Sequence, residues 1–416
     1  MSVDVLLTEG VAEKFMRYVR LDTASCEESE GVPSTQGQWE LARMLEDELR
    51  RLGLADVSVD EHCFVIGRLP SNMDQPAPAV GFVAHMDTAP AVPGRGVAPV
   101  VHRKYQGGHI CIGHGVVLRP DESPDLARAI GCDIITSDGS TLLGADDKAG
   151  VAEIMQALVE LITNPSIVRP DVWVAFTPDE EIGRGVERFP YAAFGAKVAY
   201  TLDGTALGEL SEETFNAVNG VATIEGVSSH TGDARGKMVN ALHLAAQLIS
   251  WIPASWRPET TSDREGFIHV NDIQGNVEKV SIKILIRDFD SAMLETRRAA
   301  LVSMLELLEA AHPGSRASFE AAGGYRNMKE GLDTNPQVVG LALRAMEMAG
   351  LTPRTLPIRG GTDGARMTYE GVLTPNLFTG SGDVHSRREW ECVQWMSNAV
   401  DVVVNLVQLW AEQPQK

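Results

Sequence analysis

The sequence predicts an α/β protein in which helices flank a mixed β-sheet. Short apolar runs of strand-type composition alternate with longer runs whose apolar residues recur at helical spacing. The chain has 416 residues, which is too long for one compact core, so we expect two domains. With 44% hydrophobic and 22% charged residues, its composition is that of an ordinary globular protein.

The predicted elements of the sheet and its covering helices lie on both sides of residues 213–325. Before that segment we expect helices at 11–19, 38–52 and 151–161, and strands at 57–59, 64–69, 79–84, 172–177 and 198–202. After it we expect a helix at 336–348, a strand at 376–378 and a closing helix at 393–410.

The segment 213–325 has a different pattern of elements. We expect strands at 216–227, 267–274, 277–288 and 316–321, with helices at 239–252 and 293–311. The order β-α-β-β-α-β is that of ferredoxin-like domains, which bury a core of their own. We therefore predict an inserted α+β domain at 213–325 within a catalytic, metal-binding domain formed by 1–212 and 326–416.

Composition excludes several classes of partner. The formal net charge of −21 argues against binding to nucleic acid or to an anionic membrane surface, because both require clustered Lys and Arg. No stretch of 18 apolar residues could cross a membrane. The five cysteines are scattered and form no Cys-x-x-Cys motif, which favours reduced thiols and a cytoplasmic protein.

Residues 172–183 contain an apolar run that ends in three consecutive acids, Asp179, Glu180 and Glu181. Adjacent carboxylates repel one another, and a bound cation would reverse that repulsion. Taken alone, the run is better explained by a solvated acidic turn. The metal-site hypothesis rests on three further places where apolar runs or helix starts carry similar residues, namely His85, Asp146 with Asp147, and Asp203.

Ligands of open α/β sheets bind beyond the carboxyl ends of the strands, where loops bring distant residues together. Five metal-type residues occupy such loops or the helix start beside them: His85, Asp146, Glu181, Asp203 and His385. Two imidazoles and three carboxylates suit zinc, manganese or cobalt. Two divalent cations would nearly neutralise three carboxylates and one hydroxide, so the charges favour two ions.

Several motifs together resemble the dizinc exopeptidase family with an inserted lid domain, and within it the tripeptide aminopeptidases. They are His85-Met86-Asp87-Thr88, Gly144-Ala145-Asp146-Asp147-Lys148-Ala149-Gly150, Thr177-Pro178-Asp179-Glu180-Glu181-Ile182-Gly183, Leu202-Asp203-Gly204, Ile358-Arg359-Gly360-Gly361-Thr362-Asp363-Gly364 and Asn376-Leu377-Phe378-Thr379-Gly380. The resemblance runs nearly from end to end, and the set of motifs is very specific.

The resemblance implies two Zn²⁺ ions per subunit, with Co²⁺ or Mn²⁺ as possible substitutes. By it, His85 and Asp203 bind one ion, Glu181 and His385 bind the other, and Asp146 bridges both. It also implies a cis peptide bond between Asp146 and Asp147.

The resemblance further implies a dinuclear zinc aminopeptidase that releases the N-terminal residue of tripeptides through a metal-bridging hydroxide. Glu180, next to a ligand, would be the general base and would pass the proton to the leaving amine. Asp87, two residues past His85, would accept the second N–H of that imidazole and fix its tautomer.

Three residues are expected to contact the substrate, His230, Arg287 and Arg359. In the resembling family the histidine at the position of His230 crosses a homodimer interface to stabilise the oxyanion in the partner's site. Arg287 and Arg359 are candidates for pairing with the substrate's carboxylate, although Arg287 could equally be a structural ion-pair partner.

Two other functions remain open from the sequence. A carboxypeptidase or an N-acyl-amino-acid deacylase would share every metal ligand and differ only in what binds the ends of the substrate. A non-enzymatic metal-binding or assembly protein on the same fold would be expected to lack a ligand or the base, and none is missing here.

Overall fold

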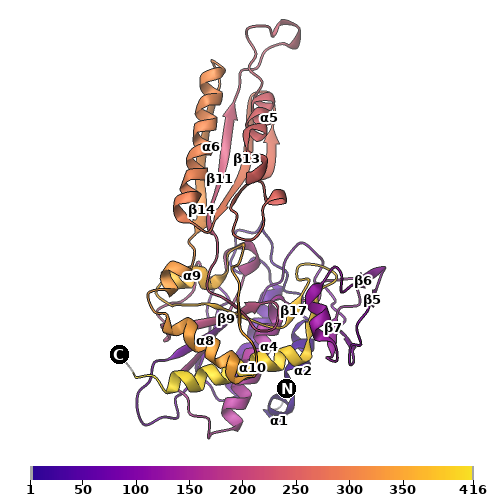
Figure 1. The fold of residues 1–416 in the computed structure, drawn as a ribbon, viewed down its shortest axis with the longest axis vertical. Coiled ribbons are helices and arrows are strands. Elements are labelled where there is room, and N and C mark those ends of the chain that lie inside the picture. The colour runs from indigo at the N-terminus through magenta and orange to yellow at the C-terminus, as the bar shows by residue number, and fades with distance from the viewer. Residues whose placement is uncertain (1–2, 415–416) are drawn as a thin grey trace. The chain divides into compact units, whose positions relative to one another are not determined.

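The computed structural model describes residues 3–414 (Figure 1). The chain divides into two compact units. The main unit contains residues 1–212, 328–356 and 362–416, and the insert contains residues 213–327 and 357–361. Each unit is described by itself below.

An eight-stranded mixed sheet forms the centre of the main unit, which confirms the predicted fold class. Its inner strands β8, β3, β9 and β16 run parallel, while β1, β2 and β10 pair antiparallel to their neighbours on the inner side. The strands in spatial order are β1 (Ala55–Val59), β2 (Val65–Leu69), β8 (Val172–Thr177), β3 (Val80–His85), β9 (Ala199–Gly204), β16 (Asn376–Phe378), β10 (Glu209–Ser211) and β15 (Arg354–Thr355).

Successive residues of a strand point to opposite faces of the sheet. Side chains on both faces of this sheet pack against other elements. On one face Phe82 and Tyr200 stack with ring centroids 6.0 Å apart, and the Tyr200 hydroxyl donates to the carbonyl of Val338 in α8 (Gln337–Met348). On the other face Val83 packs in a cluster with Phe194 and with Met367 of α9 (Asp363–Tyr369). The inner strands are therefore buried on both sides, as parallel strands usually are.

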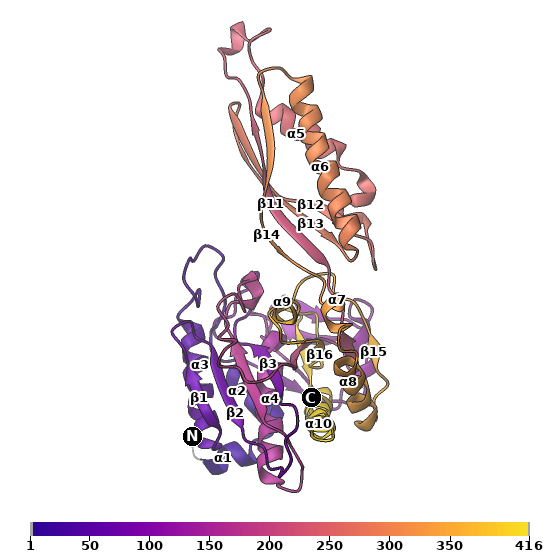
Figure 2. The same cartoon turned by 90° about the vertical axis from the view of Figure 1, so that its left-hand side faces the viewer.

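The remaining helices of the main unit surround this core (Figure 2). They are α1 (Val3–Thr8), α2 (Val11–Tyr18), α3 (Gly37–Arg51), α4 (Ala145–Thr163), α7 (Lys329–Leu332) and α10 (Val393–Ala411). α4 packs against β3 and β9 and is itself flanked by α2 and α10, which explains why it is apolar almost all round. Within residues 3–414, no helix has both the length and the apolar character needed to cross a membrane.

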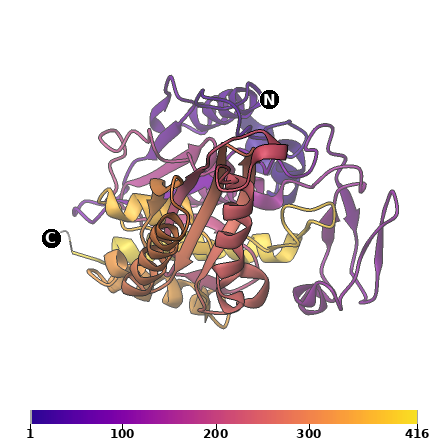
Figure 3. The same ribbon diagram turned by 90° about the horizontal axis from the view of Figure 1, so that it is seen from above.

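A second, smaller sheet was not predicted from the sequence. It is antiparallel and consists of β17 (Ser381–Gly382), β18 (Trp390–Cys392), β7 (Ile134–Thr136) and β4 (Val100–His102). A hairpin of β5 (Ile110–Gly113) and β6 (Val116–Leu118) extends from the side of the main unit (Figure 3). Strands of two to four residues are too short to show a periodicity in the sequence.

The insert has the predicted ferredoxin-like topology. Its sheet has the order β12-β13-β11-β14 with every neighbouring pair antiparallel, and α5 and α6 lie on one face of it (Figure 2). Its elements are β11 (Asn216–Glu225), α5 (Ala241–Trp251), β12 (Phe267–Gly275), β13 (Lys279–Asp288), α6 (Ser291–Ala311) and β14 (Arg316–Tyr325). The isoleucines of β13 and the leucines of both helices form its separate core.

The insert differs from the expected boundaries in two respects. It ends at Asn327 and also takes in residues 357–361, which the sequence-based boundaries assign to the catalytic domain. Backbone hydrogen bonds explain the difference, because the Ile358 N–H donates to the Glu213 carbonyl at 2.8 Å and the Ile358 carbonyl accepts from Phe215 at 3.2 Å. Such backbone pairing between segments more than 140 residues apart leaves no pattern in either segment.

Gly150 lies where α4 packs tightly against β9. A Cβ atom at this position would lie 2.0 Å from the backbone oxygen of Leu202 in β9 and 2.6 Å from Asp147 Oδ1. Neither neighbour can move without shifting the start of α4 or the strand. The glycine that ends the sequence motif 144–150 is therefore required by packing.

We expect Gly150→Ala and Gly340→Ala to change stability in opposite directions. Gly340 lies exposed in the first half of α8, and a Cβ added there would meet no atom within 4 Å, so alanine should stabilise the protein by up to about 1 kcal/mol through helix propensity. At Gly150 the steric overlap should outweigh this gain and cost about 1–3 kcal/mol. Urea unfolding of both variants measures the two signs, and a stabilised Gly150→Ala would contradict the packing argument.

Candidate metal centre

Five side chains that the sequence singled out lie together in the main unit. His85 ends β3, Glu181 follows β8 in a short 3₁₀ turn (Glu180–Ile182), and Asp203 lies near the end of β9. Asp146 precedes the regular part of α4, and His385 lies in the turn between β17 and β18. Because β3, β8 and β9 run parallel, their carboxyl ends deliver these residues to the same edge of the sheet.

Asp146 is at the middle of the group. Its Oδ1 lies 2.8 Å from His85 Nε2, and its Oδ2 lies 3.1 Å from His385 Nε2. The same nitrogen of His85 is 3.6 Å from Asp203 Oδ1, and that of His385 is 3.0 Å from Glu181 Oε2. Each oxygen of Asp146 thus faces one histidine that is paired with one further acid.

Two groups of three residues have ligand atoms that all lie within 4.8 Å of one another. They are His85 with Asp146 and Glu181, and His85 with Asp147 and Asp203. Asp147 is already engaged, because its Oδ2 accepts the backbone N–H of His85 at 3.0 Å and its Oδ1 accepts from Gly150 at 3.2 Å. We therefore regard Asp147 as a residue that fixes the backbone of His85. The peptide bond between Asp146 and Asp147 is cis.

The electrostatics of the group show acids and histidines that shift one another's pKa, with His85 buried and His385 exposed. Burial raises the pKa of Glu181 to about 7, and the nearby charge of Asp146 contributes to this rise. Burial alone would lower the pKa of His85, but the carboxylates of Asp146, Asp203 and Asp87 outweigh it and raise it. Hydrogen bonds to Asp146 and Glu181 raise the pKa of His385 to about 11. One oxygen of Glu181 is buried without a hydrogen-bond partner among the described residues.

Asp87 is fully buried beside His85. His85 Nδ1 lies 3.1 Å from the backbone oxygen of Asp87 and 3.3 Å from its Oδ1. The carboxylate also accepts the backbone N–H groups of Glu180 at 3.0 Å and Glu181 at 3.2 Å. Asp87 therefore fixes the turn that carries both glutamates as well as facing the imidazole, a second contact that the sequence did not indicate.

The Glu180 carboxylate has no hydrogen bond or ion pair to any residue in the range 3–414, although it lies half-buried next to Glu181. Burial raises the pKa of Glu180, and the negative charge of Asp203 raises it further. A carboxylate that is free of partners and has a raised pKa is suited to accept a proton.

Two buried acids near the centre were not predicted as functional. Asp363 accepts a hydrogen bond from the Thr177 hydroxyl at 2.8 Å, and burial raises its pKa to about 7. Glu389 accepts backbone hydrogen bonds from the loop that carries Asp146, and burial raises its pKa to about 7 as well. Asp363 lies within one of the motifs and Glu389 lies four residues after His385, but nothing in the sequence shows what their side chains contact.

The three predicted substrate-binding residues all belong to the insert. His230 is exposed, and its ring accepts a hydrogen bond from the Gly232 N–H at 3.2 Å. Arg287 donates to Asn219 Oδ1 at 2.8 Å. Arg359 donates to the Asp263 and Glu265 carbonyls and to the Thr261 hydroxyl, at 2.7, 3.0 and 3.1 Å. Its guanidinium is thus largely used in holding the insert together.

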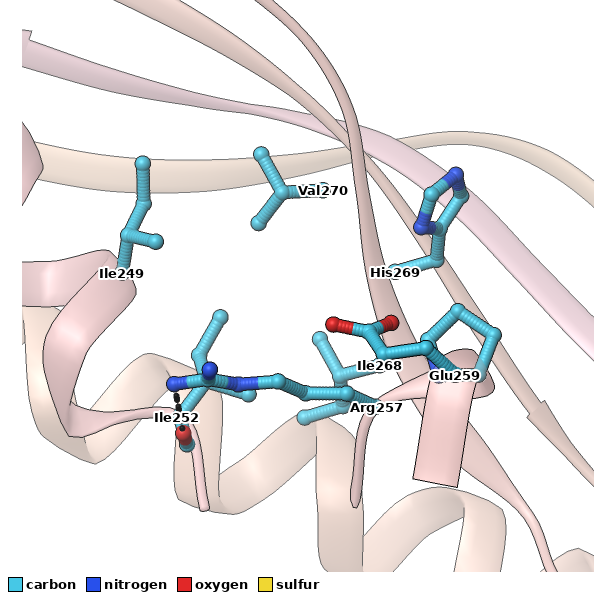
Figure 4. A pocket seen from close by; sticks show the side chains of 8 residues that line it. Ile249, Ile252, Arg257, Glu259, Ile268, His269 and Val270 are labelled. Carbon is cyan, nitrogen blue, oxygen red and sulfur yellow. Dashed lines mark hydrogen bonds between the residues drawn. The ribbon is translucent and has the colours of Figure 1, made fainter. Parts of the chain in front are cut away.

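The insert also contains a pocket of about 180 Å³ (Figure 4). Ile249, Ile252, Ile268 and Val270 form its apolar wall, with the polar side chains of Arg257, Glu259 and His269 around them. It brings no group of metal-type residues together within the described chain, so the candidate site remains the centre around Asp146 in the main unit.

Comparison with known proteins agrees with this geometry. The profile of peptidase family M20/M25/M40 matches residues 141–409. Over 408 residues the chain is 44% identical to Peptidase T of Geobacillus thermodenitrificans, covering 98% of this chain and 99% of that protein. The chain belongs to peptidase family M20/M25/M40. It is therefore a peptidase of the M20 type, a hydrolase.

Two solved structures have the same architecture. Aminopeptidase PepT from Bacillus cereus superposes with a TM-score of 0.76 at 25% identity, over 97% of this chain and 98% of that one. A tripeptidase from Staphylococcus aureus has the same TM-score of 0.76 at 22% identity, over 97% of this chain and 98% of that one. This similarity in fold extends over nearly the whole chain and includes the insert.

Glu153 of α4 is a buried acid whose protonation should make the stability of the protein depend on pH. It is fully buried, neither carboxylate oxygen has a hydrogen-bond partner within the described chain, and burial with the charges of Glu391 and Asp147 raises its pKa. The folded state therefore binds this proton more tightly than the unfolded state, so the free energy of unfolding falls as pH rises above the unfolded pKa of about 4.3.

We expect Glu153→Gln, which cannot ionise, to be more stable than the unchanged protein at pH 8 and to lose most of that advantage near pH 4.5. Urea unfolding of both proteins with a chelator present, at several pH values, measures the difference. A difference that does not change with pH would mean that Glu153 is not held as the neutral acid.

Proposed function

We propose that this peptidase is a dinuclear metallo-aminopeptidase that removes the N-terminal residue of tripeptides, with zinc as its metal. The observation that carries the proposal is the position of Asp146, whose two oxygens face His85 and His385 at 2.8 and 3.1 Å. A carboxylate placed in this way can bridge two ions, each completed by one histidine and one further acid.

The residues fit a pair of divalent cations by their chemistry. His85, Asp203 and Asp146 would hold one ion, and His385, Glu181 and Asp146 the other. Imidazole and carboxylate ligands without thiolates suit zinc, with cobalt or manganese as substitutes. The buried, unpartnered oxygen of Glu181 is further support, since a buried acceptor without a donor is costly unless a cation binds there.

When bound, the metal ions would lower the pKa of a water molecule and polarise the carbonyl group of the scissile bond. Glu180 would take the proton from this water as it attacks, and would then give the proton to the leaving amine. The hydrogen bonds from the Glu180 and Glu181 N–H groups to Asp87 hold the base and a ligand in a fixed relation. The raised pKa of Glu180 favours the first half of this transfer, in which the carboxylate accepts the proton.

The choice of a tripeptide substrate rests on the relatives named above, since the metal centre alone is equally compatible with a carboxypeptidase or an N-acyl-amino-acid deacylase. Arg287 remains the better candidate for the substrate's carboxylate, because Arg359 is engaged by three acceptors of the insert. We retain both residues in the proposal.

The family resemblance extends the proposal to a cytoplasmic homodimer in which His230 of one subunit serves the site of the other. The exposed position of His230 and the five free cysteines are compatible with this arrangement. Sedimentation equilibrium distinguishes the mass of one chain from that of two.

We expect free tripeptides to be cleaved at the first peptide bond, and N-acetylated tripeptides to be poor substrates. C-amidated tripeptides should be affected less if the free amine is the group that is recognised. Removing the metal should abolish turnover, and adding back zinc should restore it at two ions per chain. Faster cleavage of the acetylated peptides would instead favour the deacylase, and release of the C-terminal residue the carboxypeptidase.

We expect Glu180→Gln to bind both metal ions with little change and to lower kcat by a factor of about 10²–10⁴ or more, because the amide cannot accept the proton. Glu187→Gln is the matched control, since Glu187 is exposed on the same segment and pairs with Arg366. Measured metal content and tripeptide turnover decide the matter. A metal-replete Glu180→Gln with ordinary turnover would remove Glu180 from this role.

A further inference from the structure

Glu389 is a buried glutamate that the proposed chemistry does not use. Only 1% of its surface is exposed, yet both oxygens accept hydrogen bonds from one short stretch of backbone. Oε2 accepts the N–H groups of Leu143 at 2.7 Å and Gly144 at 2.8 Å, and Oε1 accepts the N–H of Asp146 at 3.1 Å. A single carboxylate thus binds the segment that delivers the central acid of the site.

The backbone of this segment is irregular. Gly144 has a φ of +83°, and the φ and ψ angles of Asp146 (−83° and 103°) and Asp147 (−127° and 35°) are not helical. The N–H groups here therefore lie ahead of the regular hydrogen bonding of α4 and need acceptors from elsewhere. Glu389 supplies those acceptors for three of them.

Glu389 is also connected to the second histidine through a short turn. His385 lies four residues before it, and within this turn the Glu389 N–H donates to the Ser386 carbonyl at 3.3 Å. The Ser386 hydroxyl donates to the Asp383 carbonyl at 2.6 Å and accepts from the Arg388 N–H at 3.1 Å. The turn that presents His385 thus also places Glu389, and β18 begins directly after it.

We propose that Glu389 is a positioning residue that fixes Asp146 relative to His385. Through it the loop of the central acid and the turn of the second histidine are held together, with Asp146 Oδ2 3.1 Å from His385 Nε2. The centre is then preorganised, and binding of the ion at His385, Glu181 and Asp146 does not have to order the loop. This inference rests on the proposed metal-dependent function.

Replacing Glu389 with glutamine tests the contact with little change in shape. The amide oxygen can accept from Leu143 and Gly144, but its NH₂ group then faces the Asp146 N–H, donor against donor. The restraint on Asp146 should fail while the rest of the loop remains held. Glu389→Asp keeps the charge but shortens the reach by one methylene group, and provides a second variant should the glutamine protein not fold.

Glu391→Gln is the matched control. Glu391 lies two residues further along the same segment, is fully buried, and accepts the N–H of Cys392 at 2.9 Å, with no hydrogen bond to the Asp146 segment within the described residues. Glu389→Gln places a buried amide directly before β18, and Glu391→Gln places one within β18. If a buried amide at this position lowers the stability of the protein, both variants should show the loss.

The experiment titrates zinc into the metal-free proteins in competition with a chromogenic chelator, and records hydrogen exchange at the amides of Leu143, Gly144 and Asp146. We expect both Glu389 variants to weaken zinc binding by about 10–100-fold, as is typical when a residue behind a ligand is lost. Both should speed exchange at the Asp146 amide, and Glu389→Gln should leave exchange at Leu143 and Gly144 little changed. Glu391→Gln should leave both readouts unchanged.

Zinc affinity in both Glu389 variants equal to that of the unchanged protein would overturn the proposal, and so would an equal loss in Glu391→Gln. Failure of the proposed function would look different. In that case the unchanged protein itself would not take up two zinc ions, whatever the variants do.

Discussion

The main unit is organised around the mutual repulsion of carboxylates that its fold brings to one edge of a sheet. Asp146, Glu181 and Asp203 share a small space with two histidines, and Asp87, Asp147 and Asp363 lie immediately behind them. Such a concentration of like charge opposes folding unless protons or cations offset it. The two histidines offset part of it, which explains their raised pKa values, and the remaining charge is what a pair of divalent ions would neutralise.

The acids behind the centre have partners of a different kind. Asp87, Asp147 and Glu389 each accept two or three backbone N–H groups, and these bonds hold the turns in which the central residues lie. The N–H donors oppose the rise in pKa that burial causes at Asp147 and Glu389, whereas Glu153 has no such donors among the described residues. The interior therefore contains acids of two types, those that position backbone and those that depend on neutralisation.

Much of this arrangement could be predicted from the sequence. The five central residues follow apolar strands or begin a helix, and strand ends of a parallel sheet meet at one edge, so His85 and Asp203 could be grouped without knowing a single contact. The ferredoxin-like insert was equally predictable, because its long strands and helices show clear periodicity. The small sheet around β7 and β18 was not, since its strands are two or three residues long.

The roles of Glu389 and Asp363 could not be predicted either, because each depends on a contact with a segment 186 to 246 residues away. For Arg359 the sequence suggested a role, but the structure shows that the side chain has other partners. Its motif suggests a substrate-binding residue, but its guanidinium donates to Thr261, Asp263 and Glu265 and lies over the rings of Phe215 and Phe267. A residue's type and motif indicate which chemistry is available, and only the fold shows which partner uses it.

Residues 357–361 belong to the insert although they lie apart from it in the sequence, and this affects how the insert could be exchanged between related proteins. The insert is not one continuous segment of the chain. Exchanging 213–327 with the equivalent part of a relative would therefore leave Ile358 and Arg359 in contact with residues from another protein. The five-residue segment would have to be exchanged together with it. Thr362 and Asp363 come directly afterwards and contact Asp203 and Thr177. The splice point therefore lies one peptide bond away from residues that pack beside the candidate metal centre.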